Sequence, residues 1–264
     1  MKHALYEDLK GRNVLITGGL GFLGRALCSE FANQGANLII LDKIAVDKEF
    51  IDDLRSRGVG AEFFQVDFES QDSRADVINS IASKFFTLDV LINNAAFVGT
   101  TDVSGWAVPF QEQSIETWRK AIEVNLTTPF QLVQGLLENL RKSSQPAIIN
   151  LGSIYGTLGP DWSLYEGTAM GNPAAYAASK GGLIQLSRWL ATTLGPTIRV
   201  NSISPGGIER NQNPTFTEKY ISKTPLKKMA TESEIVSAIL FLVSSSGSYI
   251  TGQDIKVDGG WSAW

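Results

Sequence analysis

The chain has 264 residues, of which 43% are hydrophobic and 19% charged, a balance that is ordinary for a soluble globular protein. Its formal net charge of −4, with no basic cluster, argues against nucleic acid as a partner. The single cysteine, Cys28, excludes a disulfide within the chain and fits a reducing compartment. We expect a cytoplasmic protein without a signal peptide, a membrane span or a metal site.

Short apolar runs alternate with longer stretches of helical periodicity along the whole chain. Such alternation is typical of repeated β-α-β units, in which helices cover both faces of a parallel sheet. The sequence therefore predicts one α/β domain, residues 1–264, with a doubly wound parallel sheet of about seven strands. The predicted strands are Asn13–Thr17, Asn37–Leu41, Glu62–Val66, Val90–Ile92, Ala147–Leu151, Arg199–Ile203 and Asp254–Val257. The predicted helices are Gly24–Gln34, Asp47–Arg57, Asp72–Phe86, Ser114–Arg141, Ala174–Leu194 and Glu232–Ser244.

A glycine-rich segment, Thr17–Gly24 (TGGLGFLG), joins the first predicted strand to the first predicted helix. Its glycines permit a tight turn, the close approach of a pyrophosphate and close packing of helix against strand. The helix N-terminus offers free N–H groups and a positive dipole to the phosphates. The sequence therefore predicts a dinucleotide site here, with contacts from Gly18, Gly21, Phe22, Leu23 and Gly24.

Further cofactor contacts are predicted where the next three strands end. Asp42 ends the second strand, where its carboxylate can accept both ribose hydroxyls of NAD and would repel the 2′-phosphate of NADP. NAD is therefore favoured over NADP, although the neighbouring Lys43 weakens this preference. Asp67 can accept a hydrogen bond from adenine or serve in the cap of the helix that follows Ser70, and both roles stay open. The remaining contacts predicted at these strand ends are Phe68, Asn93 and Ala95.

Tyr176 and Lys180 lie four residues apart and therefore share one face of a predicted helix. A fixed ammonium nearby favours the phenolate and lowers the pKa of a tyrosine from about 10 toward neutrality. Tyr176 is thus a candidate general acid/base for an alcohol or a carbonyl, with Ser153 upstream at the end of an apolar run. The spacing alone is weak support, because Tyr6 and Lys10 repeat it.

Taken together, these motifs resemble the short-chain dehydrogenase/reductase family over nearly the whole chain. The resemblance implies a Rossmann fold and a nicotinamide cofactor that also contacts Pro205, Gly206 and Ile208. The motifs occur in the family's order and at separations close to the family's. They are residues 17–24, Asn93–Ala96, Asn125, Ser153, Tyr176, Lys180, Pro205–Gly206 and Val257–Trp261.

The family resemblance also implies a catalytic tetrad of Asn125, Ser153, Tyr176 and Lys180. In that scheme Tyr176 transfers the proton, and Ser153 hydrogen-bonds the reacting oxygen. Lys180 holds the nicotinamide ribose and lowers the pKa of the tyrosine. The region of Asn125 anchors a relay water.

The sequence departs from the family pattern at three places. Phe22 stands where the middle glycine of the loop usually lies, and Gly21 takes the preceding position. The usual threonine after Pro-Gly is missing, because Ile208 is followed by Glu209 and Arg210. Finally, the segment between the catalytic serine and tyrosine is longer than in most relatives.

Two long segments, residues 97–113 and 154–172, follow strand ends and are rich in glycine and aromatic residues. The second resembles dehydrogenases of flagellin-modification and legionaminic acid clusters, which would imply a hydroxylated, sugar-like substrate. Packing at a subunit interface is the alternative role for such an aromatic-rich segment. The candidate substrate contacts are Ser153, Asp161, Trp162, Tyr165 and Glu166.

The leading hypothesis is an NAD-dependent oxidoreductase that moves hydride between nicotinamide and a secondary alcohol or ketone of a sugar, sugar phosphate or nucleotide sugar. A 3-oxoacyl-thioester reductase is the enzyme alternative, and an NAD-sensing binding protein is the alternative from another class. The apolar surfaces of Ser114–Arg141 and Ala174–Leu194 predict assembly. The family resemblance implies a homotetramer, with a homodimer as the alternative.

Overall fold

Seven parallel strands form one sheet at the centre of the computed structural model, which describes residues 6–98 and 103–264. Their spatial order is β3-β2-β1-β4-β5-β6-β7, so the sheet grows outward in two directions from the pair β1 and β4. The predicted doubly wound α/β fold is therefore confirmed. The strands are β1 (Asn13–Thr17), β2 (Asn37–Asp42), β3 (Ala61–Gln65), β4 (Val90–Asn93), β5 (Ala147–Leu151), β6 (Arg199–Pro205) and β7 (Asp254–Val257).

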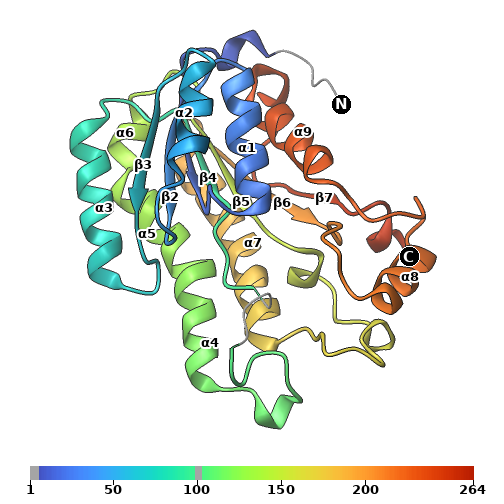
Figure 1. The fold of residues 1–264 in the computed structure, drawn as a ribbon. Coiled ribbons are helices and arrows are strands. Elements are labelled where there is room, and N and C mark those ends of the chain that lie inside the picture. The colour runs from blue at the N-terminus through green and yellow to red at the C-terminus, as the bar shows by residue number, and fades with distance from the viewer. Residues whose placement is uncertain (1–5, 99–102) are drawn as a thin grey trace.

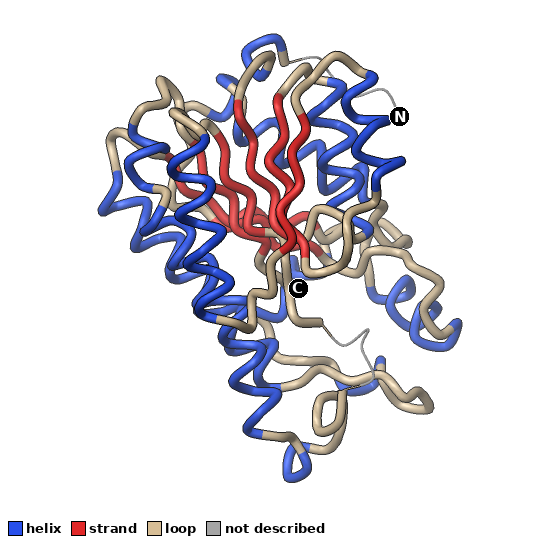
Figure 2. The backbone as a smooth tube through the Cα atoms, turned by 60° about the vertical axis from the view of Figure 1, so that its left-hand side comes forward, coloured by secondary structure: helices blue, strands red, loops and turns tan. Residues whose placement is uncertain are grey.

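Helices cover both faces of the sheet (Figure 1 and Figure 2). Helices α1, α2 and α9 pack on one face, and α3, α5, α6 and α7 pack on the other. Helix α4 continues the second layer beyond the sheet (Figure 1). The helices are α1 (Phe22–Asn33), α2 (Lys48–Ser56), α3 (Gln71–Lys84), α4 (Ile115–Ile122), α5 (Thr128–Gly135), α6 (Leu137–Arg141), α7 (Ala174–Leu194), α8 (Pro214–Lys223) and α9 (Glu232–Val243).

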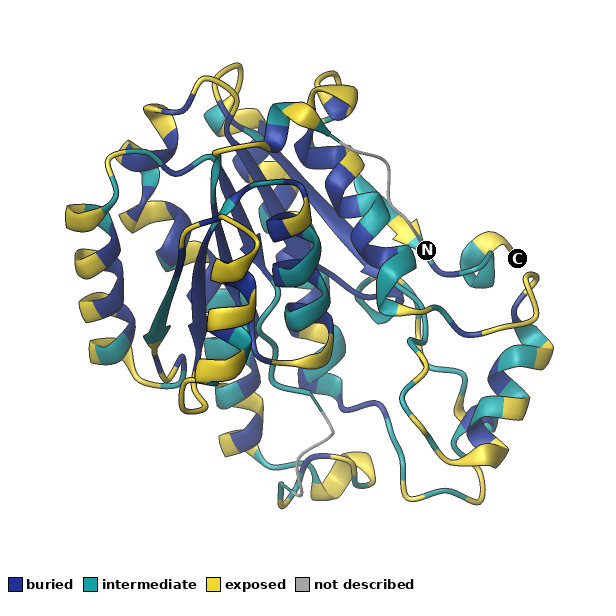
Figure 3. Cartoon of the chain, turned by 45° about the horizontal axis from the view of Figure 1, so that its top comes forward, coloured by how far each residue is buried: buried dark blue, intermediate teal, exposed yellow. Residues whose placement is uncertain are grey.

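The strands are apolar on both sides because each side faces a helical layer. Successive side chains of a strand point to opposite faces, so Val14 and Ile16 join one core cluster while Leu15 joins the other. Figure 3 shows the strands buried and the outer helix faces exposed. This double burial explains why the strands appear in the sequence as nearly continuous apolar runs. In the described part of the chain, no helix is both long and apolar enough to cross a bilayer.

The predicted helix Ser114–Arg141 forms in the structure but is not regular along its length. Helix α4 passes into a π-helical turn, Glu123–Thr127, before α5 and α6 follow. Pro129 has no N–H to donate to the carbonyl of Asn125 four residues earlier, so the α-helical ladder is interrupted there. Single π-turns within helices are frequent at functional sites. The predicted helical stretch is therefore present, with a π-helical turn that the sequence did not predict, and that turn contains a predicted site residue.

Helix α8 was not predicted from the sequence. Asn213 caps it, with its side chain accepting from the N–H of Thr215, and Pro214 occupies its first position. The helix stands apart from the sheet and packs instead against the segment 154–172 and the C-terminal end of the chain. It therefore lies to one side of the sheet, beside the C-terminal end of the chain (Figure 1).

Candidate active site

The predicted site residues collect at the carboxyl ends of β1, β4, β5 and β6, which are neighbours in the sheet. In open α/β sheets, ligands bind outside these ends, at the point where the strand order reverses. Here that point lies between β1 and β4. Among residues 6–98 and 103–264, no three acidic, histidine or cysteine side chains come together as a metal site.

The glycine loop holds the N-terminus of α1 against β1. A Cβ on Gly24 would lie 2.0 Å from the carbonyl oxygen of Gly18, so only glycine permits this packing. Gly18 itself adopts a φ of +64°, which disfavours other residues. At Gly21, by contrast, a Cβ would meet only that same carbonyl oxygen, at 3.4 Å, which leaves this side of the loop open.

The first turn of α1 fits a bound pyrophosphate. Gly21 is the N-cap residue and supplies no side-chain acceptor, and the first turn contains no acidic residue. The N–H groups of Phe22 and Leu23 therefore form the positive end of the helix dipole and have no capping side chain. These are the features that an anionic diphosphate requires, although Phe22 replaces the usual glycine.

Asn94 fastens the loop to β4, and sequence reasoning overlooked this residue. Its side-chain amide donates to the carbonyl oxygens of Thr17 and Gly18, at 2.9 and 3.1 Å. The hydroxyl of Thr17 accepts from the N–H of Ala95 at 2.9 Å. Asn93 instead points into the sheet and donates to Asn150 at 2.7 Å. The run of two asparagines in the sequence was the available signal, but it does not say which one holds the loop.

Asp42 faces the glycine loop from the end of β2. It is buried, and its carboxylate accepts from the N–H of Leu20 at 2.9 Å and from that of Ile44 at 3.3 Å. The carboxylate therefore stands beside the loop, where the ribose of a dinucleotide would pass.

Asp67 closes the turn before α3, accepting from the N–H of Glu69 at 2.9 Å. The helix cap is Ser70, whose hydroxyl accepts from Ser73, so Asp67 is not the cap. Asp67 is exposed and remains a candidate for contact with adenine. Phe68 is buried, and its carbonyl oxygen accepts from Arg74.

Lys180 and Tyr176 project from one face of α7, as their spacing predicts. Lys180 is buried, and its ammonium donates to the carbonyl oxygen of Leu151 at 2.6 Å. The same nitrogen lies 5.8 Å from the centre of the Tyr176 ring. Burial lowers the pKa of Lys180 from 10.5 to about 8, because the charged form loses hydration.

The expected decrease in the pKa of Tyr176 is not found. Burial of the phenol raises its pKa above 10, because the phenolate is the form that loses hydration. A hydrogen bond with Ser153 and the positive charge of Arg210 act in the opposite direction but do not outweigh burial. Sequence spacing placed the cation correctly, but spacing carries no information on how dry the site is.

Ser153 follows β5 and lies next to Tyr176. It is buried, and its hydroxyl oxygen accepts from the N–H of Tyr155 at 3.2 Å, starting a short 3-10 turn. That turn ends at Gly156, where a Cβ would lie 2.9 Å from the carbonyl carbon of Lys180. Glycine therefore lets the loop approach the catalytic helix closely, which brings the serine beside the tyrosine.

Asn125, in the π-helical turn, supports the site through α7. It is fully buried; its side-chain oxygen accepts from the N–H of Phe97 at 2.6 Å, and its amide donates to Ser179 at 2.9 Å. Ser179 in turn donates to the carbonyl oxygen of Tyr176 at 2.9 Å. The side chain therefore positions the helix that carries the tyrosine. The predicted relay water stays a prediction.

The segment after β6 faces the glycine loop from the other side. Gly206 donates to the carbonyl oxygen of Val257 at 3.0 Å, and a Cβ on Gly206 would lie 2.6 Å from the hydroxyl of Tyr220. Pro205 is the last residue of β6, and Ile208 forms an isolated bridge with Ala230. The predicted cofactor contacts Pro205, Gly206 and Ile208 thus lie along one ordered segment.

Segment 154–172 places its predicted substrate residues in different surroundings. Asp161 forms an ion pair with Lys223 of α8, which holds its pKa below the usual value, and its other oxygen accepts from Ser163. Trp162 is exposed, with its ring 5.9 Å from that of Tyr165. The side chain of Glu166 is exposed.

Only one of these four residues, Tyr165, turns toward the catalytic tyrosine. Its hydroxyl donates to that of Tyr155 at 2.8 Å, and the two phenols Tyr165 and Tyr176 lie close enough for ionisation of one to raise the pKa of the other. Sequence reasoning missed Tyr155, whose position two residues after Ser153 was the available signal. It also missed Asn172, a buried residue just before α7.

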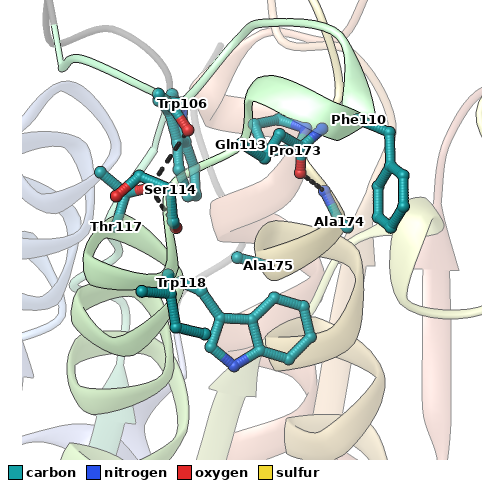
Figure 4. Close-up of a pocket in the computed structure, with 11 residues that line it drawn as sticks. Trp106, Phe110, Gln113, Ser114, Thr117, Trp118, Pro173, Ala174 and Ala175 are labelled. Atoms are coloured by element: carbon teal, nitrogen blue, oxygen red, sulfur yellow. Dashed lines mark hydrogen bonds between the residues drawn. The ribbon is translucent and has the colours of Figure 1, made fainter.

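Segment 97–113 lies partly outside the described residues, because residues 99–102 are not described. Its later part covers the N-terminal ends of α4 and α7 and lines a cavity of about 170 Å³ (Figure 4). Gln113 joins this segment to the start of α7, because its side-chain oxygen accepts from the N–H of Ala174 at 3.0 Å. Buried Trp106 packs edge-on against Phe97, with ring centres 4.9 Å apart.

Comparison with known proteins places the chain in a family. Residues 22–262 match the family model described as enoyl-(acyl carrier protein) reductase. The chain is 32% identical to the 3-oxoacyl-[acyl-carrier-protein] reductase FabG of Thermotoga maritima, over 96% of this chain and 98% of the relative. It is 30% identical to the post-translational flagellin modification protein A of Campylobacter coli, over 96% and 99% of the two chains.

Solved structures agree with this placement. A short-chain dehydrogenase from Leptospira borgpetersenii with bound NAD+ superposes with a TM-score of 0.84 at 32% identity, covering 99% of this chain and 97% of that one. A putative gluconate 5-dehydrogenase from Beutenbergia cavernae with bound NADP superposes with a TM-score of 0.86 at 27% identity, covering 98% and 100%. The chain therefore belongs to the short-chain dehydrogenase/reductase family, whose members are nicotinamide-dependent oxidoreductases acting on alcohols and ketones.

The buried ammonium of Lys180 makes a testable contribution to stability. Below pH 8 this lysine is charged in both the folded and the unfolded chain, so folding bears the full cost of burying the charge. Between 8 and 10.5 the folded lysine is already neutral, and the cost shrinks as pH rises. Lys180→Met should therefore gain stability relative to the wild type at pH 7, and the difference should fall toward pH 10.5 by on the order of 3 kcal/mol.

Urea unfolding of both proteins at pH 7 and near pH 10 measures this difference, because the other titrating groups cancel in the comparison. A stability difference that does not change with pH would contradict a depressed lysine pKa.

Proposed function

We propose that this protein is an NAD-dependent dehydrogenase that interconverts a secondary alcohol and a ketone on a sugar, sugar phosphate or nucleotide sugar. The reaction class follows from the family, and the substrate class rests on the polar groups beside the catalytic residues.

The observation that carries the proposal is the polar cluster formed by Tyr155, Tyr165 and Asn172. The two phenols are hydrogen-bonded to each other beside Ser153 and Tyr176. Asn172 is only 7% exposed; among the described residues its side chain has the hydroxyl of Tyr165 as a polar neighbour but makes no well-formed hydrogen bond. A buried amide has an acceptor and two N–H donors, so one neighbouring hydroxyl leaves capacity that the hydroxyls of a polyol can use. Aromatic rings carrying hydroxyls also suit the faces of a sugar ring.

The residues of the site divide the chemistry in a simple way. A bound nicotinamide dinucleotide supplies the centre that accepts or donates hydride. Ser153 orients the reacting oxygen, and Tyr176 takes or returns its proton. The ammonium of Lys180 stabilises the phenolate when it forms, which offsets part of the cost of burying that charge. Asn125 keeps the tyrosine in place through Ser179.

The preference for NAD is part of the proposal, since one solved relative holds NAD+ and another holds NADP. The supporting observation is the buried carboxylate of Asp42 at the edge of the glycine loop, which would repel a 2′-phosphate. We expect Asp42→Ala to reduce or reverse the ratio of kcat/KM for NAD over NADP. Steady-state kinetics with both cofactors measures the ratio, and an unchanged value would show that another residue sets the preference.

A 3-oxoacyl-thioester reductase is the second candidate, favoured by the similarity to FabG. Such an enzyme would need a basic surface for an acidic carrier protein, whereas this chain carries a net charge of −4. An NAD-sensing binding protein would not need the buried pair Tyr176 and Lys180. Both arguments favour the sugar dehydrogenase.

The deciding experiment offers NAD and NADP with a panel of sugars, sugar phosphates and nucleotide sugars, and follows formation of the reduced cofactor. A parallel assay offers NADPH and a 3-oxoacyl thioester. Turnover with members of the sugar panel supports the proposal. Turnover confined to the thioester would replace it with the reductase, and binding without any turnover would favour the sensor.

We also propose a homotetramer in the cytoplasm, with a homodimer as the alternative. Trp118 on α4, Phe130 on α5 and Trp189 on α7 are exposed on the outer helical layer, which is costly in an isolated chain. The single cysteine, Cys28, is buried and free, as suits a reducing compartment. Light scattering of the purified protein gives the mass of the assembly.

A further inference from the structure

Arg210 occupies the position after Pro205-Gly206 where the family usually has threonine, and so far its charge has entered only through its effect on the pKa of Tyr176. The backbone around it is ordered by Gln212, whose side-chain oxygen accepts from the N–H of Arg210 at 2.7 Å and whose amide donates to the carbonyl oxygen of Ile208 at 2.5 Å. Its side chain is 29% exposed. The residue is therefore held at the edge of the cleft by its own loop.

The guanidinium of Arg210 reaches the residue that follows Gly21 of the glycine loop. Its central carbon lies 5.1 Å from the centre of the Phe22 ring, a cation–π contact with the first residue of α1. Segment 205–210 and the N-terminus of α1 thus meet through this one side chain.

Most of the donors on this guanidinium are unused. Its Nε donates to Glu232 at the start of α9, at 3.2 Å. The two terminal nitrogens, Nη1 and Nη2, donate no hydrogen bond among the residues that the structure describes, which leaves four N–H groups available. An arginine with a planar fork of free donors is suited to phosphate oxygens.

The charges around Arg210 favour an anion on the α1 side. Glu232 provides one negative charge from α9, and the first turn of α1 provides none. The N–H groups of Phe22 and Leu23, at the end of α1 that Arg210 contacts, have no capping side chain. The diphosphate of a dinucleotide, with two negative charges, is the group that both the helix end and the arginine can bind together.

We propose that Arg210 is a cofactor-binding residue that closes over the pyrophosphate of the dinucleotide, with its guanidinium resting on the ring of Phe22. The pyrophosphate lies between the N-terminus of α1 on one side and this guanidinium on the other. Phe22 replaces a glycine and Arg210 replaces a threonine, so the two departures from the family pattern form one contact. The proposal rests on dinucleotide binding and not on the identity of the substrate.

The test is equilibrium binding of NADH and of ADP-ribose to Arg210→Gln and the wild type. ADP-ribose has the same pyrophosphate but no nicotinamide. A lost charge-assisted contact should weaken both ligands by the same factor, roughly 10- to 100-fold. The dissociation constants of Arg210→Lys should lie between those of the wild type and Arg210→Gln, since lysine keeps the charge but lacks the planar guanidinium. The weakening should also shrink at high salt, because the lost interaction is between charges.

Arg141→Gln is the matched control. Arg141 is exposed at the end of α6, just before β5 begins, and is paired with Glu138, so it lies toward the amino ends of the strands; its loss changes net charge by the same amount. The dissociation constants of Arg141→Gln for NADH and ADP-ribose should stay within about twofold of the wild-type values. Thermal unfolding of Arg210→Gln confirms that the fold is kept. If it is not kept, Phe22→Leu, which removes only the ring beneath the guanidinium, should weaken both ligands several-fold.

The outcomes separate this proposal from its rivals. An unchanged dissociation constant for ADP-ribose overturns it, whether or not NADH binding falls, because the contact would then lie elsewhere than the pyrophosphate. Unchanged binding of both ligands with a raised KM for the substrate would also overturn it, in favour of a substrate anion. Failure of the sugar panel leaves these binding measurements intact, so the two proposals fail independently.

Discussion

Tyr176→Phe should lower kcat by about two to four orders of magnitude while the dissociation constant for NADH stays within about twofold of the wild type. The substitution removes the only atom that transfers the proton and keeps the ring that packs in the buried site. The phenol hydrogen-bonds with Ser153, which holds it in one orientation. Burial raises the pKa of this tyrosine, so the oxidation rate should increase with pH as the phenolate becomes accessible.

Tyr249→Phe is the matched control, because Tyr249 is fully exposed on the surface and loses the same hydroxyl. Its kcat should equal that of the wild type. Steady-state kinetics on the substrate identified from the panel, together with NADH titration, gives both quantities. Turnover of Tyr176→Phe close to the wild-type value would remove this residue from the chemistry.

Replacing residues 161–166 by a short Gly/Ser loop should lower kcat/KM for the sugar by about 100-fold or more, while NADH binds normally at the separate glycine loop. The replacement removes Tyr165 from beside the catalytic tyrosine. It also removes the ion pair between Asp161 and Lys223 that joins the segment to α8. Both losses affect the substrate side of the cleft only.

Two single substitutions separate the loss of Tyr165 from the loss of the ion pair between Asp161 and Lys223. Tyr165→Phe removes the hydroxyl that pairs with Tyr155 and leaves the contact with α8 intact. Lys223→Met breaks the ion pair and leaves both phenols in place. A loss of kcat/KM in Tyr165→Phe that exceeds the loss in Lys223→Met supports direct contact with the substrate. A loop variant that keeps its kcat/KM would show that the segment has no part in substrate recognition.

Segment 154–172 is held against α8 by hydrogen bonds and by aromatic contacts. The amino group of Lys219 donates to the carbonyl oxygens of Ser163 and Glu166, at 2.9 and 3.0 Å. Tyr165 also stacks near Phe216 of α8, with ring centres 5.6 Å apart. The segment and α8 therefore form one packed unit, so a change in either one should be transmitted to the other.

Local sequence patterns determined most of the framework of this protein. Buried parallel strands require nearly continuous apolar runs, so all seven strands could be recognised, with ends shifted by at most two residues. The glycine loop was recognisable because Gly18 needs a positive φ and Gly24 has no room for a Cβ, constraints that only glycine meets. The i,i+4 pair Tyr176 and Lys180 followed from helix geometry alone.

The sequence could not determine which polar groups would be buried, paired or exposed, because these properties depend on elements distant along the chain. The ion pair of Asp161 requires Lys223, and the orientation of Asn125 requires Phe97 and Ser179. Helix α8 was missed because its apolar residues pack on a loop and not on the sheet. The raised pKa of Tyr176 was missed for the same physical reason, since hydration is lost only when the surrounding elements close around the phenol. Motif spacing thus determined the reaction class, and tertiary packing alone decided which side chains come together at the candidate site.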